Sequence, residues 1–147
     1  MRTVSDIMHS IITIDKNETL RDAAIKMVKH SRGSVIITES EKTMGILTER
    51  DIMRFVAEGY KMETTRINGH FTLNIITADE HTSLEEAARI MEKNHIRRLP
   101  ITRNDRIVGL ITASKLAKNM RYSMAERFMS DAFHPGLASE MSGRNYR

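Results

Sequence analysis

The sequence has no cysteine and no tryptophan, and aromatic residues make up only 5% of its 147 residues. Without cysteine the chain can form no disulfide framework, no thiolate zinc site and no catalytic thiol. The low aromatic content leaves few rings on which successive bases of a nucleic-acid strand could stack. These absences exclude disulfide-stapled folds and cysteine enzymes, and they disfavour platforms that bind several bases.

Long hydrophobic runs are absent as well. No stretch approaches the roughly 18 apolar residues that a membrane-spanning helix requires. The opening sequence MRTVSDIMHS also lacks the apolar segment of a signal peptide. We therefore predict a soluble, cytoplasmic protein with no membrane partner.

Charge of one sign is not gathered in blocks. The 23 Lys and Arg residues and the 19 Asp and Glu residues are spread along the chain, and the net charge is +4. No basic arm is visible, so nucleic acid is the less favoured partner. The residues that keep this alternative open are Arg97, Arg98, Arg103, Arg106, Arg121 and Arg127. A hydrophobic content of 40% predicts a folded chain of one compact domain or two very small ones.

An internal repeat organises the sequence. The segment IITIDKNETLRDAAIKM at 11–27 aligns without gaps with IITADEHTSLEEAARIM at 75–91, at an offset of 64 residues. The same offset pairs Gly45 with Gly109. One copy is too small to bury its own apolar surface well, so we expect the two copies to pack around one shared core.

Each copy predicts strands at corresponding places. The short apolar runs at 10–14 and 74–78 are rich in β-branched residues, which is typical of strands. Two further strands in each copy flank the polar loops 39–42 and 103–106, as in hairpins. A second helix is expected after the last strand of each copy, so the order is β-α-β-β-α.

The first helix of each copy has a clear beginning. Thr19 with Asp22, and Ser83 with Glu86, match capping boxes, in which a hydroxyl and an acid satisfy free backbone N–H groups. The apolar stripes that we expect to be buried are Leu20, Ala23, Ala24, Met27 and Val28, and Leu84, Ala87, Ala88 and Met91. The predicted boundaries are 1–58 for the first repeat, 59–72 for a linker, 73–120 for the second repeat, 121–134 for a C-terminal helix and 135–147 for a disordered tail.

The segment GILTERD at 45–51 carries the candidate chemistry. Thr48 ends a strand, and Asp51 lies in the first turn of the next helix, where free N–H groups favour an anion such as phosphate. The Asp51 carboxylate accepts two hydrogen bonds, which suits a ribose diol. The alternative is that both residues form a third capping box. In the second copy Lys115 stands at the Asp51 position, and lysine cannot accept a hydrogen bond.

These features together identify a family resemblance. The β-α-β-β-α order, the strand IRRLPI at 96–101 and the segment at 45–51 resemble a tandem pair of CBS domains, or Bateman module, over residues 3–120. The resemblance implies an α/β (α+β) fold of two pseudo-symmetric repeats. It also implies a regulatory protein rather than an enzyme.

The resemblance further implies two clefts, each taking its Thr and Asp from one copy and its first and second strands from the other. The nucleotide site would comprise Ile46, Thr48, Asp51, Ile76, Thr77, Arg97, Arg98 and Leu99. In it Arg98 would contact the phosphate and Asp51 the ribose, with Ile46 and either Ile76 or Leu99 near the base. The opposite cleft would combine Thr13, Ser34, Thr112 and Lys115. It lacks the carboxylate and the arginine, so we expect it to be degenerate or to bind only an anion.

The expected ligand is an adenine nucleotide, AMP, ADP or ATP, with S-adenosylmethionine as an alternative and no required cofactor. By resemblance the protein would be a homodimer that regulates another protein. The alternative function is a ligand-free scaffold that dimerises or docks on an enzyme or transporter. No catalytic residue is predicted, because no combination of Ser, His and an acid lies at recognisable junctions. No metal ligand is predicted, because the histidines show no metal-ligand spacing. They are His9, His30, His70, His81, His95 and His134.

Overall fold

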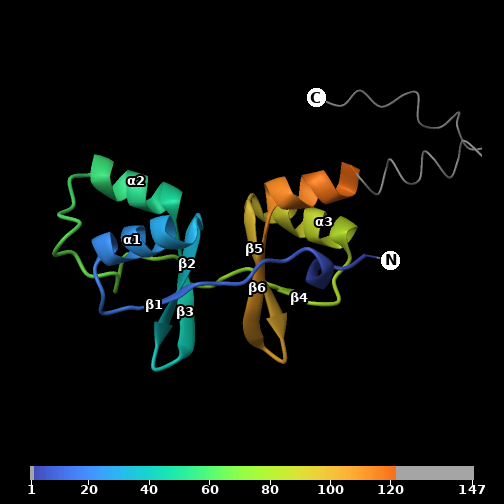
Figure 1. The fold of residues 1–147 in the computed structure, drawn as a ribbon, viewed down its shortest axis with the longest axis horizontal. Coiled ribbons are helices and arrows are strands. Elements are labelled where there is room, and N and C mark those ends of the chain that lie inside the picture. The colour runs from blue at the N-terminus through green and yellow to red at the C-terminus, as the bar shows by residue number, and fades with distance from the viewer. Residues whose placement is uncertain (1, 122–147) are drawn as a thin grey trace, which may run out of the picture.

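The computed structural model describes residues 2–121, which form two similar units side by side (Figure 1). The first contains β1 (Thr13–Asp15), α1 (Leu20–His30), β2 (Ser34–Glu39), β3 (Lys42–Thr48) and α2 (Glu49–Ala57). The second contains β4 (Ala78–Asp79), α3 (Leu84–Asn94), β5 (Arg98–Arg103), β6 (Arg106–Thr112) and a helical stretch at 113–121. The predicted α/β class and the β-α-β-β-α order are confirmed.

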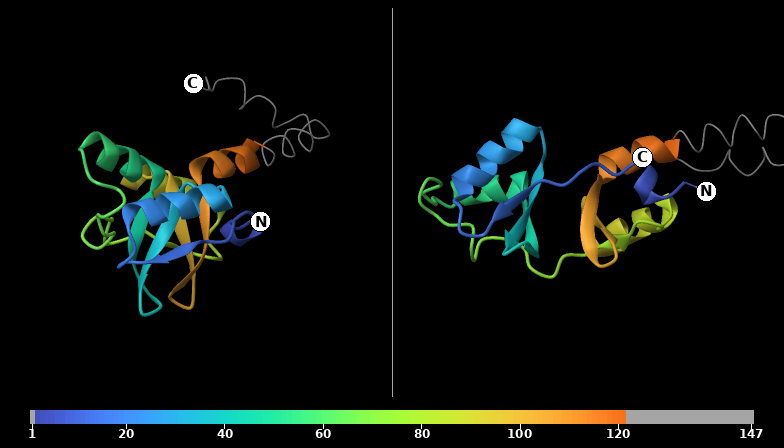
Figure 2. Two further views of the ribbon diagram at one scale, coloured as in Figure 1. Left: turned by 60° about the vertical axis from the view of Figure 1, so that its left-hand side comes forward. Right: turned by 60° about the horizontal axis from the view of Figure 1, so that its bottom comes forward.

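Each repeat has one three-stranded sheet. Its first strand runs parallel to the second, and the second runs antiparallel to the third. The predicted hairpins turn through Ser40–Glu41 and Asn104–Asp105, all four with positive φ, as a two-residue type I′ turn requires. The two sheets lie towards the middle of the molecule and the helices lie outside them, with both hairpin turns pointing the same way (Figures 1 and 2).

The first strands are shorter than the predicted runs 10–14 and 74–78. β1 has three residues and β4 has two. The residues before β1 instead cross to the second repeat, where His9 and Leu110 exchange backbone hydrogen bonds of 3.1 and 3.0 Å. A chain that leaves its own sheet to pair with another cannot continue the first strand.

The capping predictions hold in full at one helix and in part at the other. At α1 the Thr19 N–H donates to Asp22 Oδ2 at 3.0 Å, and the Asp22 N–H donates to Thr19 Oγ1 at 3.1 Å. Hydrogen bonding of the Asp22 carboxyl to the Thr19 backbone N–H, and secondly to the Thr19 side chain, lowers the pKa of that carboxyl. At α3 the Ser83 hydroxyl accepts from the Glu86 N–H, but the Glu86 carboxylate binds Arg89 at 2.8 Å and does not complete the box.

The prediction of one shared core is wrong, because each repeat has its own. The first core includes Leu20, Met27 and Leu47, and the second includes Leu84, Met91 and Leu99. On β2, Ile36 is also buried but belongs to neither core. It points to the face of the sheet opposite to that of Val35 and Ile37, as strand alternation requires. Within the predicted stripes, Val28 is wrong, since it is 80% exposed.

The two repeats exchange the segments that precede their first strands. Val4, in the short 3₁₀ helix η1 (Val4–Asp6), and Ile7 are buried in the second core. In return, the stretch 59–72 packs on the first repeat, where Ile67 is fully buried. Ile46 and Thr72 also exchange backbone hydrogen bonds of 3.1 Å. Each repeat is thus completed by the segment that precedes the first strand of the other repeat.

The paired glycines of the repeat lie where these segments cross. A Cβ at Gly45 would stand 2.3 Å from the Thr72 carbonyl oxygen, and one at Gly109 would stand 2.4 Å from Met8 Sδ. A side chain at Gly45 would therefore meet backbone, whereas one at Gly109 would require the Met8 side chain to move. The predicted C-terminal helix beyond residue 121 and the predicted tail lie outside the described residues. Between residues 2 and 121 no helix is both long and apolar enough to cross a membrane.

Candidate ligand-binding clefts between the repeats

Thr48 and Asp51 form the third capping box, at the start of α2. The Thr48 N–H donates to Asp51 Oδ2 at 2.9 Å, and the Asp51 N–H donates to Thr48 Oγ1 at 3.2 Å. The Thr48 hydroxyl also donates to Oδ2 at 2.9 Å. The other carboxylate oxygen, Oδ1, lies 3.4 Å from Arg54 Nη2. The capping interpretation is therefore correct, and Oδ1 is the atom left with capacity for a ligand.

Arg98 reaches the same helix start from the second repeat. Its Nη2 lies 2.9 Å from Glu49 Oε1, the first residue of α2. The guanidinium rests against Gly33, where a Cβ would stand 2.3 Å from Nη2. The Arg98 side chain is 22% exposed and that of Glu49 is 65% exposed. An ion pair this open to solvent is weak, so an anion can replace Glu49.

The other predicted nucleotide-site residues differ in how far they are exposed to solvent. Ile76, Thr77 and Arg97 are exposed, and Ile46 is half-buried beside the crossing segment. Leu99 is a correction: it is fully buried in the second core and cannot contact a base. The cause is strand alternation, since neighbouring residues Arg98 and Leu99 point to opposite faces of β5.

Asp51 also lines a cavity of about 280 Å³ between α2 and the stretch 60–72. The rings of Phe55, Tyr60 and His70 meet there edge to face, with centroids 5.0 to 5.6 Å apart. With Phe71 this cavity holds every Phe and Tyr of residues 2–121. The sequence predicts a linker at 59–72, and the concentration of rings in an aromatic-poor chain is the signal that could have indicated this cavity.

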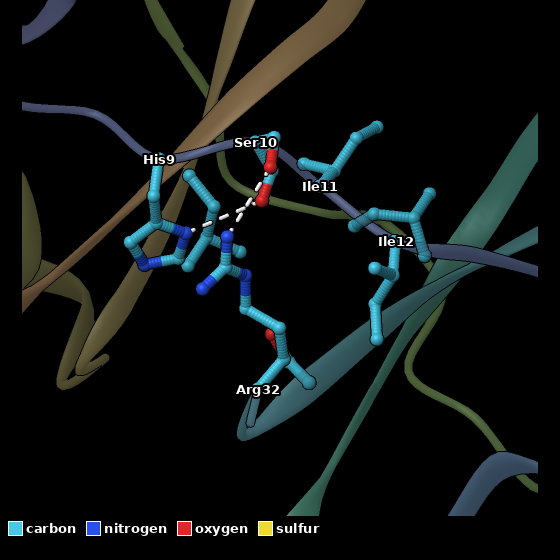
Figure 3. A pocket seen from close by; sticks show the side chains of 8 residues that line it. His9, Ser10, Ile11, Ile12 and Arg32 are labelled. Atoms are coloured by element: carbon cyan, nitrogen blue, oxygen red, sulfur yellow. Dashed lines mark hydrogen bonds between the residues drawn. The ribbon is translucent and has the colours of Figure 1, made fainter. Parts of the chain in front are cut away.

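The opposite cleft contains a small pocket lined by His9, Ser10, Ile11, Ile12, Arg32, Ser34, Ile36 and Leu110 (Figure 3). Of the four residues predicted here, Ser34 lies in this pocket. Thr13 instead lines a wider groove near the hairpin turns. Thr112 accepts a hydrogen bond from the Lys115 N–H at 3.1 Å, a cap without a carboxylate.

The expectation that this cleft lacks an arginine is wrong. Ser34 stands where the first cleft has Arg98, but Arg32 supplies a guanidinium to this pocket from a neighbouring position. Its Nη2 donates to Ser10 Oγ at 3.2 Å. His9 Nδ1 lies 3.3 Å from the Ser10 carbonyl oxygen, so that nitrogen carries the proton (Figure 3). Burial lowers the pKa of His9, and the charges of Arg32, Lys115 and Arg98 lower it further, against the effect of the hydrogen bond.

The remaining histidines build no metal centre in the part of the chain that the structure describes. Among residues 2–121 no group of three or more His, Asp or Glu side chains is placed to hold a metal ion. The side chains of the two clefts offer hydrogen-bonding and charged groups, and the two clefts differ in which of these groups they contain.

The duplicated fold, with segments exchanged and clefts between the repeats, is that of a CBS domain pair. The CBS domain matches this chain twice, at residues 4–58 and 69–122, and the chain belongs to that family. It is 32% identical over 121 residues to the CBS domain-containing protein YhcV of Bacillus subtilis (strain 168), covering 81% of this chain and 86% of YhcV.

Two further relatives widen the comparison. Hypoxic response protein 1 of Mycobacterium tuberculosis is 31% identical over 143 residues, which cover 95% of this chain and 100% of that protein. The CBS domain pair of protein MJ0100 was solved in complex with 5′-methylthioadenosine and S-adenosyl-L-methionine. It matches with a TM-score of 0.75 at 27% identity and covers 84% of this chain and 98% of that one.

Proposed function

We propose that this protein is a regulatory module that binds an adenine nucleotide, AMP, ADP or ATP, in the cleft bordered by Thr48, Asp51 and Arg98. The observation that carries the proposal is the ion pair of Arg98, from the second repeat, at the first turn of α2 in the first. A guanidinium beside the N-terminus of a helix suits a phosphate group. The adenosine-based ligands of the MJ0100 pair support an adenosine moiety.

Each group has a distinct part. The phosphate takes the place of Glu49 on Arg98, and the free N–H groups of α2 add further donors. Asp51 keeps its cap through Oδ2 and accepts from the ribose diol through Oδ1. Ile46 and Ile76 contact the base without Leu99, while Arg97 and Thr77 lie at the exposed edge. S-adenosylmethionine is the competing ligand, and the charge of Arg98 favours a phosphate over its sulfonium.

Binding of this kind carries a signal. Arg98 and Glu49 belong to different repeats, so a phosphate that separates them changes how the repeats are held together. A cytoplasmic protein can report that change through its conformation or dimer geometry to a protein that it regulates. No catalytic step is needed for this role.

A homodimer is the assembly that we propose, formed through α1 and α2. Four large apolar side chains lie on the surface of these helices with exposures of 49 to 80%: Ile25, Val28, Met53 and Val56. Exposed apolar side chains on two helices that are in contact favour an interface. The same observation favours the second candidate function, a scaffold that docks on another protein without binding a nucleotide.

A thermal-shift panel of AMP, ADP, ATP, GTP and S-adenosylmethionine tests the proposal. A ligand at one hundred times its dissociation constant adds about 2.7 kcal/mol to the native state, so an adenine nucleotide should raise the Tm. At the same ligand concentration the shift should be much smaller in Asp51→Ala and should persist in Lys118→Gln, an exposed cation on the last described helix. If no ligand in the panel raises the Tm, the scaffold function is favoured.

A further inference from the structure

A single ion pair joins the two repeats. Of the ion pairs formed within residues 2–121, that of Arg98 with Glu49 alone has its partners in different units, β5 in the second and α2 in the first (Figure 1). Glu49 is the first residue of α2. Its carboxylate therefore stands at the helix start, on the arginine that we assign to the phosphate.

The repeat shows that the fold does not require this carboxylate. The Glu49 N–H donates to the Gly33 carbonyl oxygen at 2.9 Å, and the Ala113 N–H donates to the Arg97 carbonyl oxygen at 2.8 Å. The two hydrogen bonds are equivalent at the offset of 64 residues, yet one helix begins with a charged side chain and the other with a methyl group. The backbone contact is common to both repeats, and the charge is particular to the first.

Gly33 makes room for the pair. A Cβ at this position would stand 2.3 Å from Arg98 Nη2 and 3.1 Å from Glu49 Oε1. Gly33 is not among the glycines with positive φ, so its backbone conformation is open to other residues. The close approach of the guanidinium is therefore what a side chain at position 33 would disturb.

The two partners differ in how freely they can move. The Arg98 side chain is 22% exposed and that of Glu49 is 65% exposed, so a phosphate that binds Arg98 turns the carboxylate out and leaves the guanidinium in place. Glu49 stays fixed by its backbone at the start of α2, and its negative charge remains beside the phosphate. The nearby cation Arg54 already faces Asp51 and Glu58, at 3.4 and 3.7 Å.

We propose that Glu49 makes this cleft selective for ligands with one phosphate, a nucleoside monophosphate, over the di- and triphosphates. The selectivity rests on the proposed nucleotide function and narrows its ligand class. Glu49 competes with every phosphorylated ligand for Arg98. It also repels each additional phosphate, because like charges close to the surface of a protein disfavour one another. Adenosine carries no phosphate and is indifferent to both effects.

Calorimetric titration of the full chain with adenosine, AMP and ATP tests the selectivity, at pH 8 and without divalent cations. At that pH the AMP phosphate, whose second pKa is about 6, is fully ionised. Glu49→Gln should tighten AMP about threefold and ATP at least about tenfold, since it removes one charge beside the phosphates, and it should leave adenosine unchanged. The matched control is Glu63→Gln, an exposed acid in the stretch 59–72 that gives the same change in net charge. It should leave all three affinities unchanged.

Gly33→Ala tests the contact from the other side. The added Cβ meets the end of a flexible arginine side chain, so the variant should fold with nearly the wild-type Tm. It should displace the guanidinium and weaken AMP at least about fivefold, while adenosine binding stays the same. An equal loss for AMP and adenosine would show that the variant distorts the cleft and that the guanidinium position is not what Gly33 preserves.

The ratio of the ATP and AMP dissociation constants decides the proposal. An unchanged ratio in Glu49→Gln would overturn it and leave Glu49 as an acid that stabilises the N-terminus of α2. An equal change of the ratio in Glu63→Gln would also overturn it, because the effect would then be one of net charge. If neither wild type nor Glu49→Gln binds AMP or ATP, the nucleotide function itself fails; binding with an unchanged ratio removes only the selectivity.

Discussion

The two repeats share one backbone plan and differ in the chemistry placed on it. Thr48 and Thr112 both cap a helix, but Asp51 completes the first cap and Lys115 stands at that position in the second. Arg98 occupies the start of β5, where β2 has the buried Ser34. Capping and strand pairing therefore fix the fold at positions common to both repeats, while the ligand-facing positions are free to diverge.

The outer faces of the helices diverge in the same way. Ile25 and Val28 of α1 are 49% and 80% exposed, and the offset of 64 places Arg89 and Glu92 at the same positions of α3. In the part of the chain that the structure describes, α3 carries no such exposed apolar residues, so the fold does not require them. If these apolar residues form the interface, the dimer joins the first repeats of the two copies and not a first repeat to a second.

The largest expected effect is a loss of stability at the crossing points. Gly45→Ala should lower the free energy of unfolding by about 3 kcal/mol, because the added Cβ meets the Thr72 carbonyl, which is fixed by its pairing with Ile46. Gly109→Ala should cost about 1 kcal/mol, since the Met8 side chain can move aside. Urea unfolding measures both, and equal losses would show that the two crossings are equivalent.

The next effect separates the two helix starts as ligand sites. Asp51→Ala should weaken nucleotide binding by about 1.5–3 kcal/mol through the loss of charge-assisted hydrogen bonds. It should also lower stability by about 1 kcal/mol, because Asp51 completes the cap of α2. Lys115→Ala should change neither the stability nor the binding at this cleft. Calorimetry and thermal unfolding on the same variants decide; a stability loss with unchanged affinity would leave Asp51 as a cap alone.

The helix faces give a prediction for assembly. Val28→Glu places a charge in the proposed interface of both copies and should raise the dimer dissociation constant at least about tenfold, or about 1.4 kcal/mol. Glu92→Lys, the equivalent position of α3, should leave it unchanged. Sedimentation equilibrium measures both variants. A dimer that survives Val28→Glu and is lost in Glu92→Lys would place the interface on the second repeat.

The smallest effect compares the two threonine caps. Thr48→Ala should cost about 1 kcal/mol, since it removes the acceptor for the Asp51 N–H and the bond to its carboxylate. Thr112→Ala should cost about half as much, because it loses only the bond from the Lys115 N–H. Thermal unfolding of the pair tests this order, which a reversed ranking would contradict.

Local signals in the sequence were sufficient for the elements. The repeat, the caps at Thr19 and Thr48, and the two hairpins follow from spacing, and the structure contains them, with turns two residues shorter than the predicted loops. The sequence did not predict the separate cores. Val4 and Ile67 lie on the crossing segments, and each is buried in a core whose other residues are distant in sequence. No short-range pattern records that exchange.

The candidate clefts were predicted unevenly for a similar reason. Alternation along the strand could have excluded Leu99, because it adjoins Arg98 and therefore faces the core. Arg32 was missed because the offset compares only aligned positions, and this arginine enters the second cleft from a turn two residues before Ser34. A side chain that substitutes from a neighbouring position leaves no trace in a repeat alignment.

The central claim is that one cleft takes groups from both repeats, and calorimetry of Arg98→Ala with AMP and with adenosine tests it most directly. Arg103→Ala, at the far end of β5, is the control. We predict that Arg98→Ala weakens AMP by about 1.5–3 kcal/mol and changes adenosine by less than about 0.5 kcal/mol. Asp51→Ala should weaken both ligands, because both carry the ribose diol. Equal effects of Arg98→Ala on AMP and adenosine, or none on either, would contradict the shared cleft.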